Sequence, residues 1–276
     1  MIPSLLRLCR LYYAVPISLT FLLTVYYARG GQMAGHWLVD ALAAAGLMLV
    51  IAGAYALNDA CDVAADRVNS PHRPIASGNT SRRAAVCFGC LLTLAGLMLA
   101  TQRWPFLLVL TAVALGLLAY NLFSKRLGWG KPILAAVLMT SFYALALAQA
   151  GGAAGSRAWS LAIFPAWLLP TVFSYELLKD IRDIPGDRAA AFGGLVHRRP
   201  TYWRSVANAV VVAPCVLLIG PFLLGCAWVY LAGAILATGL AVASGFLSER
   251  YAIRAIYAEC FILAVAAALD VMIFGV

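Results

Sequence analysis

Long stretches without a charged residue dominate this sequence and constrain its fold more than any other feature. Only 11% of the 276 residues are Asp, Glu, Lys or Arg, whereas about 25% are charged in an ordinary soluble domain. Seven long stretches carry no charge at all: 11–28, 41–57, 84–102, 104–124, 132–156, 158–175 and 205–248. Each is close to or above the ~20 residues that a helix needs to cross a bilayer. The sequence therefore excludes a soluble globule.

The number of membrane spans follows from the lengths of these stretches. Residues 205–248 are too many for one span and include Gly220, Pro221 and Gly225, which predict two helices joined by a tight turn. A last apolar segment, 255–276, carries only Glu259 and Asp270. Nine spans result, and the short connections leave no room for a soluble domain. We therefore predict one all-α transmembrane domain over residues 1–276.

The distribution of Lys and Arg predicts the orientation. If the N-terminus is cytoplasmic, 17 of the 20 basic residues fall on the cytoplasmic side, and only Arg29, Arg103 and Arg157 fall outside. This asymmetry satisfies the positive-inside rule at every connection. The sequence thus predicts a cytoplasmic N-terminus and an outside C-terminus, and the net charge of +9 needs no nucleic acid to explain it.

Acidic residues are few, and seven of the eleven gather in two segments on the predicted cytoplasmic side. The segments read Asn58-Asp59-x-x-Asp62-x-x-x-Asp66 and Glu176-x-x-Lys179-Asp180-x-x-Asp183-x-x-x-Asp187. Both share the spacing Asp-x-x-Asp-x-x-x-Asp, which places three carboxylates within a ~60° arc of one helix. Pro185 and Gly186 are expected to end the second helix, so Asp187 is expected on a loop.

Three carboxylates on one helix face repel one another, so a cation is expected to compensate them. Mg²⁺ fits, because it is usually bound by one or two carboxylates together with water and phosphate oxygens. Basic residues on the same side of the membrane are candidates to hold the phosphates: Arg67, Arg73, Lys125, Arg126, Lys179, Arg182 and Arg188. Carboxylates interleaved with Arg and Lys favour a diphosphate substrate.

The two segments resemble the signatures of a known family. The first continues as Asp66-Arg67-x-Asn69-x-Pro71-x-Arg73-Pro74-Ile75, and the second as Asp183-Ile-Pro-Gly-Asp187-Arg188-Ala-Ala. Together with Tyr120 followed by Lys125-Arg126, they resemble the motifs of the UbiA-type superfamily of intramembrane prenyltransferases. The residues of these motifs are more similar to those of the branch that includes digeranylgeranylglyceryl phosphate synthases and the chlorophyll and homogentisate prenyltransferases than to those of the 4-hydroxybenzoate enzymes. The first helix lacks the Arg-Pro-x-x-Asn element that many members carry.

The resemblance implies nine helices around a central cavity, with a prenyl diphosphate bound through two Mg²⁺ ions at the cytoplasmic end. The roles that it implies for this chain are as follows: Asn58, Asp62 and Asp66 for one metal, with Asp59 in support; Asp180, Asp183 and Asp187 for the other; Arg73, Lys125 and Arg126 for the diphosphate; and Tyr120 for the allylic cation through its ring or for the diphosphate through its hydroxyl. Neutralising the leaving diphosphate would let the allylic C–O bond ionise.

The expected function is therefore Mg²⁺-dependent transfer of an isoprenoid chain to an apolar or aromatic acceptor, or to a glycerol-phosphate lipid, within a bacterial or archaeal plasma membrane. The site would face the cytoplasm. A membrane terpene cyclase on the same fold stays open, because there the cation is captured within its own chain. A cation-coupled transporter is more remote, since transport sites normally lie near the bilayer midplane.

Glu259 and Asp270 stand apart from this site, because they lie within the last apolar segment. An ionisable side chain inside a membrane is costly and needs a partner. Glu259 is expected either to bond to a neighbouring helix or to line the cavity.

Overall fold

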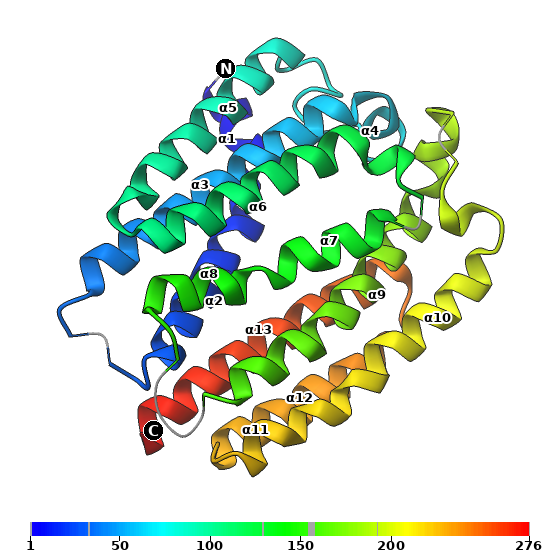
Figure 1. Cartoon of the computed structure of the whole chain (residues 1–276). Coiled ribbons are helices and arrows are strands. Elements are labelled where there is room, and N and C mark those ends of the chain that lie inside the picture. The colour runs from blue at the N-terminus through cyan, green and yellow to red at the C-terminus, as the bar shows by residue number, and fades with distance from the viewer. Residues whose placement is uncertain (1, 33, 129, 154–157, 192, 276) are drawn as a thin grey trace. The chain divides into compact units, whose positions relative to one another are not determined.

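The computed structural model describes residues 2–32, 34–128, 130–153, 158–191 and 193–275, and this part of the chain is helical, without a β-strand. The predicted all-α class is confirmed. The helices, labelled in Figure 1, are α1 (Ile2–Leu8), α2 (Leu11–Ala28), α3 (Trp37–Cys61), α4 (Val63–Asn69), α5 (Arg82–Leu99), α6 (Trp104–Phe123), α7 (Gly130–Thr140), α8 (Phe142–Ala150), α9 (Ser160–Ala189), α10 (Pro200–Val212), α11 (Ile219–Leu223), α12 (Trp228–Ser244) and α13 (Glu249–Phe274).

Eight helical segments of the described chain are long and apolar enough to cross a membrane. They are Leu11–Ala28, Trp37–Cys61, Arg82–Gln102, Trp104–Phe123, Gly130–Ala150, Ser160–Ala189, Pro200–Leu223 and Glu249–Phe274. The ninth predicted span corresponds to α12, an apolar helix of 17 residues. The count of nine and the orientation of the termini stay predictions, and Arg157 lies outside the described residues.

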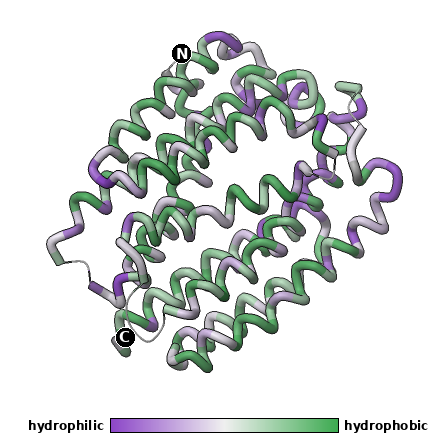
Figure 2. The backbone as a smooth tube through the Cα atoms, in the orientation of Figure 1, coloured by the Kyte–Doolittle hydropathy of each residue, from purple (hydrophilic) through white to green (hydrophobic). Residues whose placement is uncertain are grey.

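The chain forms two compact units. Unit 1 contains Met1–Leu19, Leu38–Lys131 and Asp183–Leu195, and unit 2 contains Thr20–Trp37, Pro132–Arg182 and Val196–Val276. In both units the long helices are mostly hydrophobic, and hydrophilic residues concentrate at helix ends and in connections (Figure 2). This pattern is typical of helices that face lipid, because every backbone group inside a bilayer must be bonded within the chain.

The predicted break within 205–248 occurs between α11 and α12. The turn contains Gly225 at φ 109°, a left-handed conformation that glycine adopts without steric cost. Gly220 and Pro221 do not form the turn, because both lie within α11.

In unit 1, α3 and α5 lie side by side (Figure 1). Four glycines lie where the two helices pack together. A Cβ added at Gly46 would lie 2.7 Å from the Gly96 carbonyl oxygen, and one added at Gly53 would lie 2.6 Å from the Gly89 carbonyl oxygen. The two pairs are seven residues apart on both helices, so they lie on the same face two turns apart. Small residues at these positions let the two backbones approach closely.

In unit 2, side chains of other helices cap both ends of α12. The Asp270 carboxylate on α13 accepts hydrogen bonds from the backbone N–H groups of Ala227 (2.8 Å) and Tyr230 (3.0 Å). At the other end, Nη2 of Arg204 donates to the carbonyl oxygens of Ser244 (2.9 Å) and Leu247 (2.6 Å). An anion at the N-terminus and a cation at the C-terminus both oppose the helix dipole. Asp270 is therefore a structural cap.

Replacing Asp270 is expected to destabilise the protein. Asp270→Ala would remove the acceptor of two backbone N–H groups, and the cost should be about 2 kcal/mol of unfolding free energy. Asp270→Asn keeps one acceptor oxygen and should cost less. Thermal unfolding in detergent measures both, and an alanine variant as stable as the parent would show that the cap contributes nothing.

Glu259 lies on the same helix, α13, and is fully buried. The Cys215 thiol lies 4.0 Å from its Oε1 atom. Of the two expectations for Glu259, this contact favours a bond to a neighbouring helical segment of unit 2.

Candidate functional site

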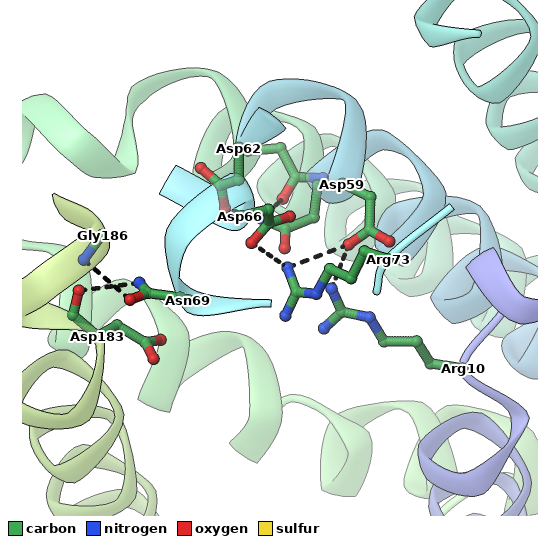
Figure 3. Close-up of polar contacts among 10 residues, drawn as sticks. Arg10, Asp59, Asp62, Asp66, Asn69, Arg73, Asp183 and Gly186 are labelled. Atoms are coloured by element: carbon green, nitrogen blue, oxygen red, sulfur yellow. Dashed lines mark hydrogen bonds and ion pairs between the residues drawn. The ribbon is translucent and has the colours of Figure 1, made fainter. Parts of the chain in front are cut away.

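The first aspartate segment spans a break between two helices. α3 ends at Cys61 and α4 begins at Val63, and Asp62 between them adopts φ −98° and ψ 13°. The backbone hydrogen bonds nevertheless continue, from Asp62 N to Asn58 O and from Asp66 N to Asp62 O, both at 2.9 Å. The expectation of three carboxylates on one continuous helix face is thus wrong. Asp59 and Asp66 point toward Arg73, whereas Asp62 points away from it (Figure 3).

Two arginines hold the buried carboxylates of this segment. Asp59, 2% exposed, pairs with Arg10 through its Oδ1 atom. Nη1 of Arg73 lies 3.4 Å from the same oxygen and 2.5 Å from Oδ1 of Asp66. The four side chains form a chain of alternating charge, Arg10–Asp59–Arg73–Asp66 (Figure 3). We call it the charge chain. It balances two carboxylates with two guanidinium groups.

Arg10 adopts an unusual backbone conformation to reach Asp59. It lies between α1 and α2 at φ 44°, a left-handed conformation that costs a residue other than glycine about 1–2 kcal/mol. Its guanidinium carbon also lies 4.9 Å from the centroid of the Tyr55 ring, within the range of a cation–π contact. The ion pair and the ring contact offset this backbone cost.

The electrostatics of Asp66 follow from its burial. Burial raises the pKa of the Asp66 carboxyl above its ordinary value, while the Arg73 guanidinium lowers it and limits the rise. A second cation beside Asp66 would add to the lowering effect of Arg73 and so favour the charged carboxylate.

An amide network orients Asn58. Its Nδ2 atom donates to Oδ2 of Asp62 (3.1 Å) and to Oδ1 of Asn121 on α6 (3.3 Å). Asn121 in turn donates to the carbonyl oxygen of Ala54 on α3 (2.9 Å). Tyr120, half-buried, precedes Asn121 on α6. Because both of these bonds use the Asn58 amide nitrogen, the amide oxygen is the atom that suits a hard cation.

The second aspartate segment lies entirely on α9. This helix continues through Pro185 and Gly186 to Ala189, so the expectations of a helix end at Pro185 and of Asp187 on a loop are wrong. Asp187 is helical and buried. One reason is that the Asn69 side chain bonds to this part of α9. It donates to the Asp183 carbonyl oxygen (2.9 Å) and accepts from the Gly186 N–H (2.8 Å) (Figure 3).

The unit 2 part of α9 carries the remaining acidic residues of the segment. Glu176 and Asp180 are buried, and Nζ of Lys179 pairs with Oε1 of Glu176 at 2.7 Å. Positions 176, 180, 183 and 187 follow one another at intervals of four, three and four residues, so they share one face of α9. The predicted shared face is therefore present in the second segment.

The surroundings of the other predicted basic residues differ from one another. Arg67 on α4 and Arg126 beyond α6 are exposed. The Lys125 side chain lies outside the described residues. Lys179 lies against Glu176 and over the Tyr175 ring, with 5.4 Å from Nζ to the ring centroid.

The donor set of the first segment fits a hard divalent cation. Asn58, Asp62 and Asp66 offer oxygen atoms, which Mg²⁺ prefers, and Asp183 adds another carboxylate in unit 1. Among the residues that the structure describes, no three His, Cys, Asp or Glu side chains are already grouped as a metal site. The charge chain gives a reason, since Arg73 occupies Asp66. Sites that bind Mg²⁺ together with phosphate need only one or two carboxylates per ion.

Three residues of the site carried no separate prediction: Arg10, Asn69 and Asn121. Asn69 lies within the first signature, so the sequence indicated that it is near the site but not what its side chain contacts. Arg10 and Asn121 were not distinguishable from an ordinary helix-flanking arginine and a helical amide.

Comparison with known proteins agrees with the resemblance of the two aspartate segments. Residues 17–265 match the UbiA prenyltransferase family. The digeranylgeranylglyceryl phosphate synthase of Hyperthermus butylicus is 32% identical over 237 residues, which cover 80% of this chain and 76% of that protein. The protein of the same name from Halobacterium salinarum is 30% identical over 213 residues, covering 74% and 73%.

Solved structures share the fold. A UbiA homolog from Archaeoglobus fulgidus bound to DMAPP and Mg²⁺ superposes with a TM-score of 0.74 at 12% identity, over 98% of this chain and 99% of that one. The apo structure of a UbiA homolog from Aeropyrum pernix K1 gives a TM-score of 0.72 at 18% identity, over 96% and 98%.

Proposed function

Because the chain belongs to the UbiA prenyltransferase family, we propose that it transfers an isoprenoid chain from a prenyl diphosphate to a glycerol-phosphate lipid within the membrane, with Mg²⁺ as cofactor. The observation that carries the proposal is the site of unit 1, where oxygen donors for a metal adjoin arginines that suit a diphosphate. The acceptor class comes from the relatives, whose name describes a glyceryl phosphate carrying two geranylgeranyl chains. An apolar or aromatic acceptor is the alternative.

Two Mg²⁺ ions form part of the proposal. Asn58, Asp62 and Asp66 would hold one of them, and Asp180, Asp183 and Asp187 on α9 would hold the other. Bound Mg²⁺ neutralises the charge that develops on a departing diphosphate. Asp59 is assigned a different role, because its carboxylate already holds Arg10 and Arg73.

The basic residues bind the diphosphate and Arg73 is the principal one. Arg73 is 22% exposed and contacts Asp66 through one Nη atom. If a metal ion took the place of Arg73 beside Asp66, the guanidinium would be able to turn to a phosphate oxygen. Asp59 lies 3.4 Å from the same Nη1 atom of Arg73 and balances the charge of the guanidinium beside the site. Arg67, Lys125, Arg126 and Lys179 are further candidates to bind phosphate.

Tyr120 is assigned to the allylic cation that forms when the C–O bond breaks. An aromatic ring attracts a cation through its face, and the attraction strengthens where water is excluded. Its neighbour Asn121 is fixed by the hydrogen bond to Ala54, which ties this turn of α6 to α3.

The orientation of the site is also proposed. The chain is an integral membrane protein, because its described residues include eight apolar helices long enough to cross a bilayer and because it belongs to this family. The excess of Lys and Arg around both aspartate segments supports a cytoplasmic site.

The test uses purified protein in detergent, supplied with geranyl, farnesyl or geranylgeranyl diphosphate, with and without Mg²⁺ and geranylgeranylglyceryl phosphate. We expect Mg²⁺-dependent release of diphosphate and a lipid heavier by one prenyl group in the mass spectrum of the organic extract. A cyclised hydrocarbon in place of that lipid would indicate a terpene cyclase. No release from any donor with the lipid acceptor present would reject the proposed reaction.

A further inference from the structure

The Asn69 side chain links the two aspartate segments within unit 1. It belongs to the last turn of α4, three residues after Asp66, and its amide bonds to the backbone of α9 at Asp183 and Gly186. We propose that Asn69 is a positioning residue, which sets the carboxylates of Asp183 and Asp187 against Asp66 and so determines how tightly the site binds its metal. The inference rests on the proposed function, since it assigns the metal to these carboxylates.

The two hydrogen bonds act in opposite directions through one planar group. Nδ2 donates to the Asp183 carbonyl oxygen at 2.9 Å, and Oδ1 accepts from the Gly186 N–H at 2.8 Å. Two points of contact resist both sliding and rotation of this turn of α9 relative to α4. Because both partners are backbone groups, the contact holds the helix itself, on which Asp183 and Asp187 are carried.

Gly186 shows that this contact demands a close approach of the two segments. A Cβ added there would lie 2.3 Å from Nδ2 of Asn69 and 2.6 Å from the Ala65 carbonyl oxygen. Any larger residue at 186 must therefore push α4 away from α9. The pairing also demands an amide at 69, since a carboxylate has no hydrogen to donate to the Asp183 carbonyl.

Groups that orient metal ligands have a characteristic effect when they are lost. Removing them typically weakens metal affinity or activity by about 10–100-fold, although the ligands themselves remain. Asn69 is expected to behave in this way, because no atom of it is assigned to the metal. A residue that served only stability would lower the unfolding temperature and leave the metal affinity of the folded protein unchanged.

The experiment measures binding of Mn²⁺ in the presence of inorganic diphosphate, from the electron paramagnetic resonance signal of free Mn²⁺. Mn²⁺ is used in place of Mg²⁺ because it also prefers oxygen ligands and gives an electron paramagnetic resonance signal. The variants are Asn69→Ala and Asn69→Leu, which both lack the amide and add no charge. Asn79→Ala is the matched control, because Asn79 is exposed and its Nδ2 atom donates to the hydroxyl of Ser77, outside both aspartate segments. Thermal unfolding in a chelator separately reports stability.

We expect Asn69→Ala and Asn69→Leu to bind Mn²⁺ about tenfold more weakly than the parent, and Asn79→Ala to bind it equally. Parent-like binding by both Asn69 variants would overturn the inference and leave the proposed function intact. Absence of Mn²⁺ binding in the parent protein would overturn both.

Gly186→Ala tests the same contact from the other side and keeps the inference falsifiable if the Asn69 variants do not fold. It should weaken Mn²⁺ binding by a similar factor, and parent-like binding would overturn the inference. The double variant Asn69→Ala/Gly186→Ala should bind Mn²⁺ within about twofold of the single variant that binds it more weakly, because both changes break the same contact. Multiplied losses in the double variant would show that the two residues act separately, against the inference.

Discussion

Asp62→Asn and Asp183→Asn are each expected to lower diphosphate release at least about 10³-fold while the protein stays folded. The substitutions keep the shape of the side chain and remove the negative charge, and a bound metal contributes several kcal/mol to stabilising the leaving group. Diphosphate release with geranylgeranyl diphosphate, Mg²⁺ and acceptor measures the effect. Thermal unfolding in detergent shows whether the variants remain folded.

Asp62 and Asp183 are the acidic residues whose replacement tests the metal site most directly. Asp59 and Asp66 hold Arg10 and Arg73, so changing either would also leave a guanidinium group unbalanced. Asp62 bonds to the Asn58 amide and points away from Arg73. The control is Glu249→Gln, which neutralises a partly exposed carboxylate on α13 that lies 3.9 Å from Arg204. Near-normal release by Asp62→Asn or Asp183→Asn would remove that residue from the metal site.

Gly53→Leu and Gly96→Leu are expected to lower the unfolding free energy by about 3 kcal/mol or more each. A Cβ at Gly53 would lie 2.6 Å from the Gly89 carbonyl oxygen, and one at Gly96 would lie 2.5 Å from the Gly46 carbonyl oxygen. Backbone atoms cannot yield as a flexible side chain can, so α3 and α5 must separate. A loss of this size should lower the unfolding temperature in detergent by about 10 °C.

Gly239→Leu provides the matched control for these two variants. Gly239 also lies within a long apolar helix, α12, but it is exposed and a Cβ there would meet no atom within 4 Å. Leucine favours a helix over glycine by somewhat less than 1 kcal/mol, so this change should be neutral or stabilising. If Gly53→Leu and Gly96→Leu unfolded at the same temperature as Gly239→Leu, the close approach of α3 to α5 would not contribute to stability.

Much of the architecture is readable from the sequence because bilayer physics leaves few choices. A stretch such as 104–124 has no charged residue, and inside lipid its backbone groups must bond to one another, which makes it a helix. The two aspartate segments are equally visible, because acidic residues are rare elsewhere and the spacing repeats. The chemistry of the site follows from residue type, since clustered carboxylates beside arginines predict a metal and a phosphate whatever the detailed fold.

The course of the helices at Pro185 and at Asp62 was not readable in the same way. Pro185 and Gly186 are ordinary helix-ending residues, yet α9 continues past them, bonded to Asn69 from 117 residues earlier in the chain. The reverse holds at Asp62, where α3 ends without a proline or glycine and the backbone hydrogen bonds continue. Local propensity is a weak guide at both places, because contacts distant in sequence outweigh it.

The sequence by itself determined the helical membrane class, the two aspartate segments and the kind of chemistry that they support. These properties depend on composition and on spacing along one helix, both of which are local. Only the tertiary structure decided the partners: Arg10 with Asp59, 49 residues apart, Asn69 with Gly186, and Asp270 with the start of α12. A charge or an amide bonds to whichever group folding brings within about 3 Å, and that proximity depends on the packing of the helices.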